Sequence, residues 1–371
     1  KDMPAIITDK FRIHNSEQFH EAFSESSGNT MYLGIGRPQA FATSTRADSR
    51  TNNEGSDTSP VTPADNVNAQ FYPFDDLLAA KKITSSDVTF AIPRRNWTTG
   101  TTYDIYRHDY GERITGTTTN QTANSGATTL HDASFYVLTA ARNVYKVLDN
   151  DGNTASTVEP TGTSTAILST ADGYKWKYMY TLSASEQANF LSTDFMSVTT
   201  NSTVASAAVD GAINIVKIKT AGSGGSDGTH TNIDIRGDGT GGKVSVTVTS
   251  GAVTAVTVTT PGTGYTFGTI SNAQIVAAGA TSLTGAELDV IIEPKGGHGK
   301  NAVEELGGFY VMLNTSLEGT ESSNTSDFTV SNDFRKIALI RDPLSGGSAA
   351  SATTLRGTKA INLTGVSGTF T

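Results

Sequence analysis

The chain contains no cysteine, so its 371 residues can form neither a disulfide framework nor a cysteine-rich zinc site. Charged residues make up only 17% of the chain, and no dense block of lysine and arginine is present to neutralise phosphates. With a net charge of −9 as well, the sequence predicts no nucleic-acid partner. No apolar run approaches the roughly 18 residues that a membrane-spanning helix needs, which predicts no membrane partner. The N-terminal KDMPAIITDKF lacks a signal-peptide core.

Glycine is abundant, with 37 residues, and threonine is frequent. Such a composition favours short strands joined by turns over long helices. The predicted fold class is mainly β with some α (α+β), with a small Gly/Thr-rich β repeat module. The length is sufficient for two or three domains with proper cores.

Three regions are expected along the chain. Residues 1–205 form an N-terminal α+β domain, residues 206–290 form the Gly/Thr-rich repeat module, and residues 291–371 form a β-rich segment that packs back on the first domain. The chain does not begin with methionine, and it stops on the strand-like LTGVSGTFT. We therefore expect it to be a piece of a longer polypeptide, truncated in its last segment.

Two helices are predicted in the first region. Asn15 with Gln18 fits the cap of a helix that ends at Gly28. A second short helix is predicted over 73–82, where acidic residues come first and lysines last. Between them lies a polar loop, 42–70, predicted to be a contact arm or a mobile flap. Strands are predicted at 31–36, 88–97, 102–110, 134–140 and 143–149, the last two adjacent. After 291, a helical turn is predicted at 304–306, and FYVMLN and KIALIRD are predicted as strands.

The most informative segment is DGYKWKYMYTLSASEQANFLSTDF, at 172–195. Asp172-Gly173 is a turn signal, and the aromatic residues from Trp176 onward alternate with other residue types in the period of a strand. One face of that strand is expected against a core and the other toward solvent or a partner. Ser183 with Glu186 fits a helix-capping box. The segment therefore predicts a turn, a strand and a short helix.

An internal repeat lies in the second region. Residues 210–228 align without gaps on residues 250–268, with glycines and apolar residues at matched positions. KVSVTVTS, at 243–250, is an alternating strand between the two copies. The repeat predicts two equivalent strand-and-turn units with Val216, Ile218, Val256 and Val258 on interior faces, and two copies are too few for a solenoid.

Two patterns suggest ligand sites but are better explained as turns. Asp149-Asn150-Asp151-Gly152-Asn153 resembles the start of a calcium loop, but its glycine comes too early and position twelve is Pro160. A hairpin turn is favoured there. The glycine clusters at 222–225 and 237–242 lack the Lys-Ser/Thr ending of a phosphate-binding loop, so tight turns are favoured over nucleotide binding. No metal ion and no cofactor are predicted.

The six histidines lack the spacing of a metalloprotease, and no G-x-S-x-G motif accompanies them. A structural hydrogen-bonding role is favoured for each. GGHGKNAVEELGG, at 296–308, is the most enzyme-like string, because His298 is followed by Glu304 and Glu305. Neighbouring carboxylates in the sequence do not establish the opposed pair that glycosidases use. An ordered loop or interface contact is favoured, and no catalytic residue is predicted.

Several motifs together carry a family resemblance: ITDKF (7–11), MYLGIGRP (31–38), AIPRRNW (91–97), TYDIYRHDY (102–110), DGYKWKYMYTL (172–182) and NDFRKIALIRDPL (332–344). The chain resembles the baseplate wedge protein of T-even-type contractile-tailed phages, the product of gene eight, and its relatives in myophages of cyanobacteria. The resemblance covers most of 1–200 and the third region, whereas 206–290 departs from the T-even pattern.

The resemblance implies a non-enzymatic structural subunit of the virion tail baseplate, assembled in the host cytoplasm. It implies a homodimer that joins other baseplate wedge proteins around the tail tube, with no small-molecule substrate. It also implies an architecture of β-sandwich-like domains around a mixed α/β layer. Two alternatives remain open: a tail-fibre or receptor-binding component, and a polysaccharide-degrading tail enzyme. The candidate core or interface residues are Trp97, Tyr103, Tyr106, Trp176, Tyr178, Tyr180, His298 and Phe334.

Overall fold

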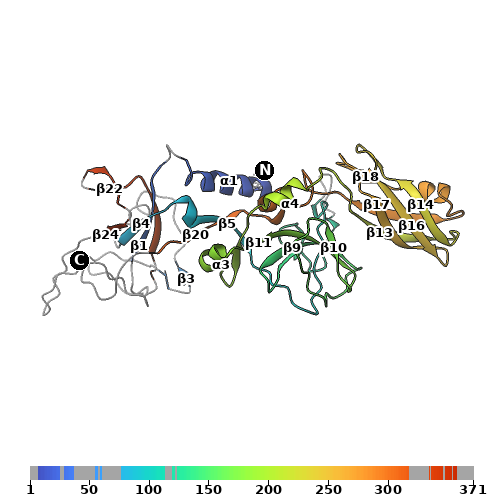
Figure 1. Ribbon diagram of the computed structural model, residues 1–371, viewed down its shortest axis with the longest axis horizontal. Helices are drawn as coiled ribbons and strands as arrows, with labels where there is room; N and C mark the ends of the chain where they lie inside the picture. The colour runs from blue at the N-terminus through green and yellow to red at the C-terminus, as the bar shows by residue number, and fades with distance from the viewer. Residues whose placement is uncertain are drawn as a thin grey trace. The chain divides into compact units, whose positions relative to one another are not determined.

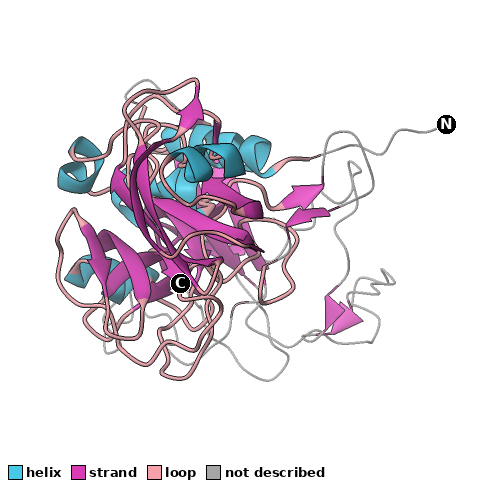
Figure 2. Ribbon diagram, turned by 90° about the vertical axis from the view of Figure 1, so that its right-hand side faces the viewer, coloured by secondary structure: helices cyan, strands magenta, loops and turns pink. Residues whose placement is uncertain are grey.

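The computed structural model describes residues 7–25, 29–36, 55–56, 59–60, 77–112, 119–121, 123–316, 334, 336–345, 347–352 and 354–356. Strands predominate and the helices are short, which confirms the predicted mainly β class with some α (Figure 1, Figure 2). The chain divides into two compact units: Lys1–Ser16 with Phe90–Tyr310, and Glu17–Thr89 with Val311–Thr371. The division into 1–205, 206–290 and 291–371 stays a prediction.

The first unit is built on a four-stranded antiparallel sheet of order β10-β11-β9-β8. Its strands are β8 (Tyr136–Leu138), β9 (Asn143–Asn150), β10 (Ile167–Ser169) and β11 (Tyr174–Thr181). The predicted pairing of the strands at 134–140 and 143–149 is confirmed, because β8 pairs with β9. Helix α3 (Ala184–Phe190) follows β11 and begins at the capping box of Ser183 and Glu186, as the sequence predicts.

Strand β11 is buried on both faces, which differs from the half-exposed strand that its alternation predicts. Trp176 is 0% exposed, but Met179 at 1% and Lys177 at 6% are also buried. The strand lies inside the sheet between β10 and β9, and two hydrophobic clusters meet there. A lysine in the sequence therefore does not mark the solvent face of this strand.

Several short strands and helices lie around this sheet. Strand β12 (Phe195–Ser197) pairs with β5 (Val88–Pro93) through residues 91–93, and β20 (Tyr310–Leu313) begins at the last residue of this unit. Helices α4 (Ser202–Ser206) and α6 (Ala302–Leu306) begin at the side-chain caps of Asn201 and Asn301. Strands β6 (Gly111–Glu112) and β7 (Thr119–Gln121) form a small pair. The predicted helical turn at 304–306 is confirmed within α6.

Residues 213–292 form a hydrophobic core of their own. Strand β13 (Ile215–Ser223) pairs with β19 (Thr284–Ile291), and β14 (Gly228–Asp234), β16 (Lys243–Thr249) and β17 (Ala252–Thr260) form a three-stranded sheet. Helix α5 (Asn272–Ala277) and the short pair β15 (Arg236–Gly237) and β18 (Gly268–Thr269) complete this region. Val216 lies in the core, and Ile218, Val256 and Val258 pack against it, as predicted.

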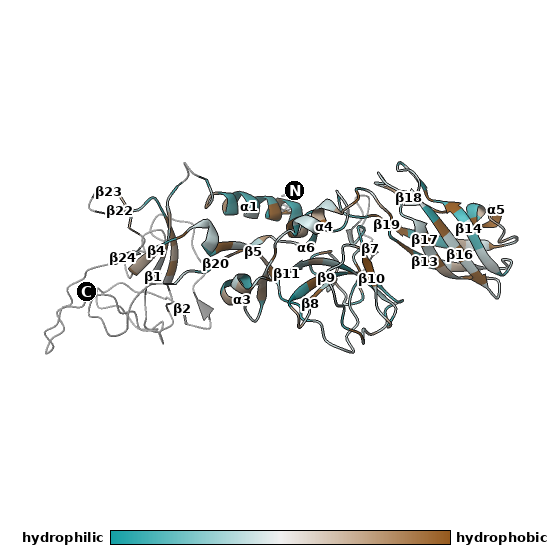
Figure 3. Ribbon diagram, viewed as in Figure 1, coloured by the Kyte–Doolittle hydropathy of each residue, from teal (hydrophilic) through white to brown (hydrophobic). Residues whose placement is uncertain are grey.

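The alternation of β16 explains how this core is filled. Val244, Val246 and Val248 are at most 2% exposed, whereas the residues between them face outward. Figure 3 shows the resulting mixture of hydrophobic and hydrophilic residues along the strands of this region. Because successive side chains of a strand point to opposite faces, the VSVTVT sequence places valine inside and hydroxyl residues outside.

The two copies of the repeat have the same backbone conformation at matched glycines. All six glycines have positive φ, a conformation that costs other residues free energy. The pairs are Gly211 and Gly251 at 63° and 80°, Gly222 and Gly262 at 69° and 69°, and Gly224 and Gly264 at 75° and 74°. The copies are therefore equivalent strand-and-turn units, as the sequence predicts.

Hydrogen bonds join the start of each copy to the end of the other. Tyr265 N donates to the Gly211 carbonyl at 3.0 Å, and Gly225 N donates to the Gly251 carbonyl at 2.9 Å. Tyr265 and Gly225 occupy matched repeat positions, as do Gly211 and Gly251. The two hydrogen bonds are therefore equivalent: in each, the end of one copy donates to the start of the other.

The second unit contains a four-stranded antiparallel sheet of order β21-β1-β4-β24. Its strands are β21 (Lys336–Arg341), β1 (Met31–Gly36), β4 (Leu77–Lys82) and β24 (Thr354–Arg356). The predicted strands at 31–36 and 336–342 are confirmed. Tyr32, Ala80 and Ala350 form its buried cluster. The remaining elements are the 3-10 turn η1 (Ser85–Asp87) and the pairs β2 (Gly55–Ser56) with β3 (Ser59–Pro60), and β22 (Leu344–Ser345) with β23 (Ser348–Ala349).

Two predicted elements are wrong, and a third, the first helix, is present with a different start and end. The helix predicted over 73–82 is a strand at Leu77–Lys82, because both its edges pair, with β1 and with β24. The first helix is α1 (Asp9–Glu21), so Asn15 lies inside it and is not its cap. Residues 102–110 belong to no strand and are held by isolated bonds such as Tyr106 N to the Val147 carbonyl.

Apart from the short pair β2 and β3, the predicted contact arm at 42–70 lies outside the described residues. Asp151, Gly152 and Asn153 form a turn in which each residue has positive φ. It is not a tight hairpin, since the preceding β9 pairs with β11. None of the described helices is both long and apolar enough to cross a membrane.

Candidate functional site

The loop between β19 and α6 carries the GGHG sequence at 296–299. Gly296, Gly297 and Gly299 have φ values of 86°, 90° and 91°. A Cβ on Gly297 would lie 2.4 Å from the Val209 carbonyl oxygen, and one on Gly299 would lie 2.4 Å from Val204 Cγ1. The glycines therefore allow this loop to lie against α4 and the residues that follow it.

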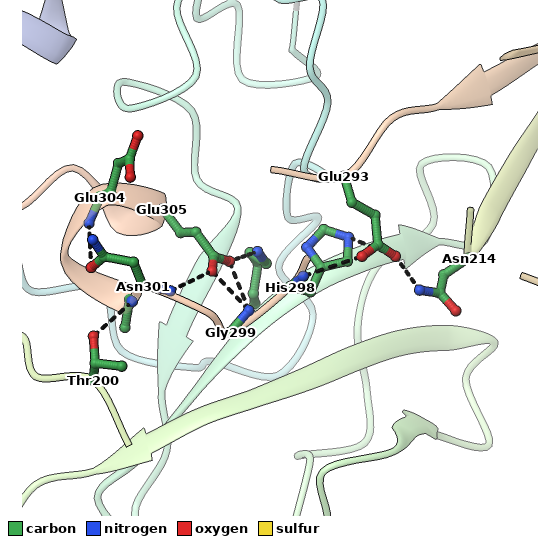
Figure 4. A network of polar contacts seen from close by, with 10 residues as sticks. Thr200, Asn214, Glu293, His298, Gly299, Asn301, Glu304 and Glu305 are labelled. Atoms are coloured by element: carbon green, nitrogen blue, oxygen red, sulfur yellow. Dashed lines mark hydrogen bonds and ion pairs between the residues drawn. The ribbon is translucent and has the colours of Figure 1, made fainter. Parts of the chain in front are cut away.

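Glu305 on α6 forms a buried ion pair with Lys146 of β9. The Lys146 side chain is 0% exposed and that of Glu305 is 3% exposed. Glu305 also accepts hydrogen bonds from the backbone N–H groups of Gly299 at 2.8 Å and Asn301 at 3.2 Å (Figure 4). Lys146 Nζ lies 4.8 Å from the centre of the Tyr106 ring. This carboxylate has the charge partner and hydrogen bonds that a buried ion requires.

Glu293 forms a second set of contacts just after β19. Its carboxylate accepts hydrogen bonds from the Asn214 side-chain amide and from His298 N at 3.1 Å, and its Oε1 lies 3.7 Å from His298 Nε2 (Figure 4). Burial raises the pKa of Glu293 to about 7, because the hydrogen bonds only partly offset the loss of water. Glu293 can therefore exchange a proton near neutral pH.

His298 is held neutral inside the protein. Burial, with Lys146 and Lys177 nearby, keeps the pKa of His298 well below its usual range. Its ring packs edge-on against Tyr106, with 5.0 Å between the centroids and 88° between the planes. Within the described residues, His298 Nδ1 has no hydrogen-bond partner. The ring therefore serves mainly as packing between Glu293 and the aromatic core.

A cavity of about 480 Å³ lies beside this network. Its polar lining includes Lys177, Asn214, Glu293 and His298, and its remaining lining is mostly small, apolar or threonine residues. A concave, largely apolar site with a few polar groups, one of them with a shifted pKa, is the usual form of a binding site. This cavity is the candidate functional site.

The predicted aromatic residues gather in two clusters. Tyr103, Trp176 and Tyr178 are buried together, with Trp97 partly buried against them. Trp176 stacks on Tyr174 with 5.2 Å between the ring centroids, and its Nε1 donates to Thr170 Oγ1 at 3.1 Å. In the neighbouring cluster lie Tyr106 and Tyr180.

Only one predicted residue, His298, lines the cavity. It contacts Tyr106, but the other predicted aromatic residues belong to the hydrophobic clusters. Phe334 is half-buried in the second unit. Whether any of these residues lies at an interface with a partner stays a prediction.

Sequence reasoning missed four polar residues of the network: Lys146, Lys177, Asn214 and Glu293. A signal was present for two of them, because Lys146 and Lys177 interrupt the apolar strands NVYKVL and KWKYMY. Glu293 directly follows the apolar VII at 290–292, which is a weaker signal of the same kind. Nothing in the sequence marks Asn214.

Three other histidines make hydrogen bonds within the fold. His108 Nδ1 accepts from Ile292 N at 3.1 Å, His131 Nδ1 lies 2.9 Å from Asp9 Oδ2, and His230 Nε2 lies 3.0 Å from the Ser226 carbonyl. In the part of the chain that the structure describes, no group of three or more His, Asp or Glu side chains is arranged to hold a metal ion.

The comparison with protein families gives one match. Residues 5–137 match the family model described as Phage-Gp8: Bacteriophage T4, Gp8. No curated protein matches the chain. The matched residues include four of the motifs on which the sequence resemblance rests: ITDKF, MYLGIGRP, AIPRRNW and TYDIYRHDY. Residues 5–137 are therefore similar to the gene-eight family of phage baseplate wedge proteins, and this match supports a location in the tail baseplate of the virion.

Proposed function

We propose that this chain is a structural subunit of the baseplate wedge in a contractile-tailed bacteriophage, where it joins neighbouring wedge proteins around the tail tube. The family match over residues 5–137 is the observation that carries this proposal. The mainly β fold and the large buried aromatic clusters fit a subunit that works through rigid contacts. The proposed role is non-enzymatic.

Polar contacts between the repeat region and the rest of the first unit support a structural role. Arg107 contacts Asp289 of β19 at 3.3 Å, and Lys217 of β13 contacts Asp149 of β9 at 2.6 Å. Each joins a strand of the repeat region to the aromatic part of the same unit. The His108 bond to Ile292 N does the same. Several such contacts at one junction hold the repeat region to the aromatic part of the unit, which fits a structural role.

The contacts of Glu305 also favour a structural role for this residue over a role in glycan cleavage. A general acid needs a proton to donate, and a nucleophile needs an accessible carboxylate. Glu305 is buried and contacts an ammonium group and two backbone N–H groups. Its arrangement fixes the 296–301 loop onto β9.

The proposal includes a homodimer that also contacts at least one different wedge protein. Stable interfaces of this kind bury about 1,200 Å² or more in total. Light scattering coupled to size-exclusion chromatography measures the number of copies, and mixing the purified chain with the other wedge proteins measures assembly. Two copies per particle and incorporation into a wedge are expected.

Two outcomes would contradict the proposal. A trimer that stays outside the wedge would favour the tail-fibre or receptor-binding alternative, since fibres generally associate as trimers. Release of reducing sugar from host polysaccharide by the purified chain would favour the tail-enzyme alternative. Variant Trp176→Ala provides a control for misfolding, because it disturbs the core without touching the exposed surface.

A further inference from the structure

Two lysines with the same charge are paired inside the first unit. Lys177 of β11 is the direct cross-strand partner of Lys146 of β9. Both are buried, at 6% and 0% exposure. Like charges directly opposite each other in a sheet are destabilising, and buried charges normally have a charge partner.

Among the described residues, the two lysines differ in their partners, because a carboxylate contacts Lys146 and none contacts Lys177. Lys146 pairs with Glu305, whereas the Lys177 ammonium donates to the Thr165 carbonyl oxygen. Among the described residues, no carboxylate lies within 4 Å of Lys177. Glu293 and Glu305 act on it from farther away, and burial lowers the pKa of Lys177. Within the described residues, the Lys177 ammonium group is therefore without a carboxylate in direct contact.

Lys177 lies at the wall of the cavity beside the network. Lys177 and its bonding partner Thr165 both line this space of about 480 Å³. We propose that the cavity receives an acidic side chain from an extended segment of a neighbouring protein, and that the carboxylate of this side chain pairs with Lys177. The proposal rests on the proposed function, because it takes the neighbour to be another baseplate protein.

The rest of the cavity wall fits a polypeptide. Ile167, Val209, Ala212 and Pro261 supply apolar surface around the polar end, and the lining contains no Phe, Tyr or Trp on which a sugar ring could stack. The volume suits a few residues of an extended chain. Asn214 also lines the cavity, and its amide is directed at Glu293. A carboxylate flanked by small apolar residues complements this surface in charge and in shape.

Glu293 is an acidic residue of the cavity lining, and its charge would affect the binding of the incoming carboxylate. Its oxygens already accept hydrogen bonds from Asn214 and from His298 N. Because burial raises its pKa to about 7, Glu293 is largely uncharged in mildly acidic buffer and does not repel an incoming carboxylate there. Binding is therefore measured at about pH 6, where an aspartate side chain in solution is ionised.

The test uses short peptides on the unmodified full chain. The probe is the peptide AVDVA, blocked at both ends, and its matched control is AVNVA, which differs only in the charge. Calorimetry or NMR titration measures the dissociation constants. We expect AVDVA to bind at least about tenfold more tightly than AVNVA, the factor expected for a buried hydrogen bond to a charged group. The proposal is wrong if the two peptides bind equally or not at all.

Two variants test whether Lys177 causes the difference in affinity between the two peptides. Lys177→Met should abolish the difference between the peptides, whereas Lys219→Met should preserve it, because Lys219 is 57% exposed and pairs with Glu287. If acetate alone competes as well as AVDVA binds, the cavity takes a small free anion and the protein segment is excluded. The peptide assay contains no other wedge protein, so wedge formation without peptide binding would reject this inference and leave the proposed function intact.

Discussion

Lys146 and Lys177 lie directly opposite each other on β9 and β11, and Glu305 forms an ion pair with Lys146 alone. The two residues have the same type, comparable burial and neighbouring positions, but they differ in their charge partner. This difference predicts opposite effects on stability when each lysine is replaced by methionine, a side chain of similar length without charge.

Lys146→Met should destabilise the protein by about 3 to 5 kcal/mol, because it leaves the Glu305 carboxylate buried without its cation. Lys177→Met should stabilise the protein, since it removes a buried ammonium group that has no carboxylate in contact. Urea unfolding at neutral pH measures both free energies. Equal destabilisation by the two substitutions would show that Lys177 is paired as well as Lys146 is.

Trp176→Ala should cost about 3 to 5 kcal/mol of unfolding free energy, the usual loss for a large aromatic residue in a core. Trp176 is 0% exposed, stacks on Tyr174 and bonds to Thr170. Trp97→Ala is the matched control, and its smaller expected loss follows from its partial burial. Chemical denaturation with circular dichroism measures both. An unchanged midpoint for Trp176→Ala would contradict the assignment of this residue to the core.

Glu293 should make stability depend on pH around neutrality. Burial raises its pKa to about 7 from the ordinary value of 4.5, so the folded state binds the proton more tightly than the unfolded state. Its contribution is fully present below about 4.5 and is lost as the pH rises through 7. Glu293→Gln should remove this decline. Glu287→Gln, at an exposed residue of β19, should leave the decline as it is. Thermal melting from pH 4.5 to 8 gives the comparison.

Asp172 should make the protein less stable as the pH falls, which is the opposite pH dependence to that of Glu293. Burial alone would raise its pKa, but hydrogen bonds from the Thr170 hydroxyl and from Thr157 N and Val158 N lower it to about 2. The stability it contributes is present above about pH 4 and is lost as the pH falls toward 2. Asp172→Asn should flatten the acid limb of a melting profile. Asp194→Asn, at an exposed residue, should leave the acid limb unchanged.

Gly211→Ala should destabilise the repeat region strongly. Gly211 has φ of 63°, and an added Cβ would lie 2.3 Å from Tyr265 N. Gly285→Ala is the matched control: its φ is 70°, but nothing lies within 4 Å of its added Cβ. The control should lose only about 1 kcal/mol, the cost of the left-handed conformation. Equal losses in the two unfolding titrations would show that the contact between the repeat copies is loose.

Local signals in the sequence were sufficient where local contacts decide the structure. The cap of α3 was predictable because Ser183 and Glu186 satisfy each other's backbone three residues apart. The two repeat copies were predictable because they carry glycine at the same positive-φ positions. The strand at Leu77–Lys82 was not predictable in this way. Its residues favour a helix, and only pairing with distant β1 and β24 makes it a strand.

The polar network was not predictable either, because it also depends on contacts between segments that are distant in sequence. Lys146 and Glu305 are 159 residues apart, and each reads as a surface residue in its own segment. The GGHG string is unusual in the sequence, but the reason for its glycines lies elsewhere in the chain. The Val204 side chain and the Val209 backbone occupy the space that a Cβ on Gly299 or Gly297 would fill. Which charges are buried follows from the packing of segments distant in sequence, and one sequence alone does not record that packing.

The pairing of β13 with β19 places Ile215 opposite Ile291, so the polypeptide enters and leaves the repeat region of the first unit at adjacent points. A stretch whose two ends meet can be replaced by another of different length while the flanking strands keep their positions. The segment between these isoleucines is therefore suited to exchange as a cassette. Recombination between phages could change it while preserving the part of the chain that carries the family match.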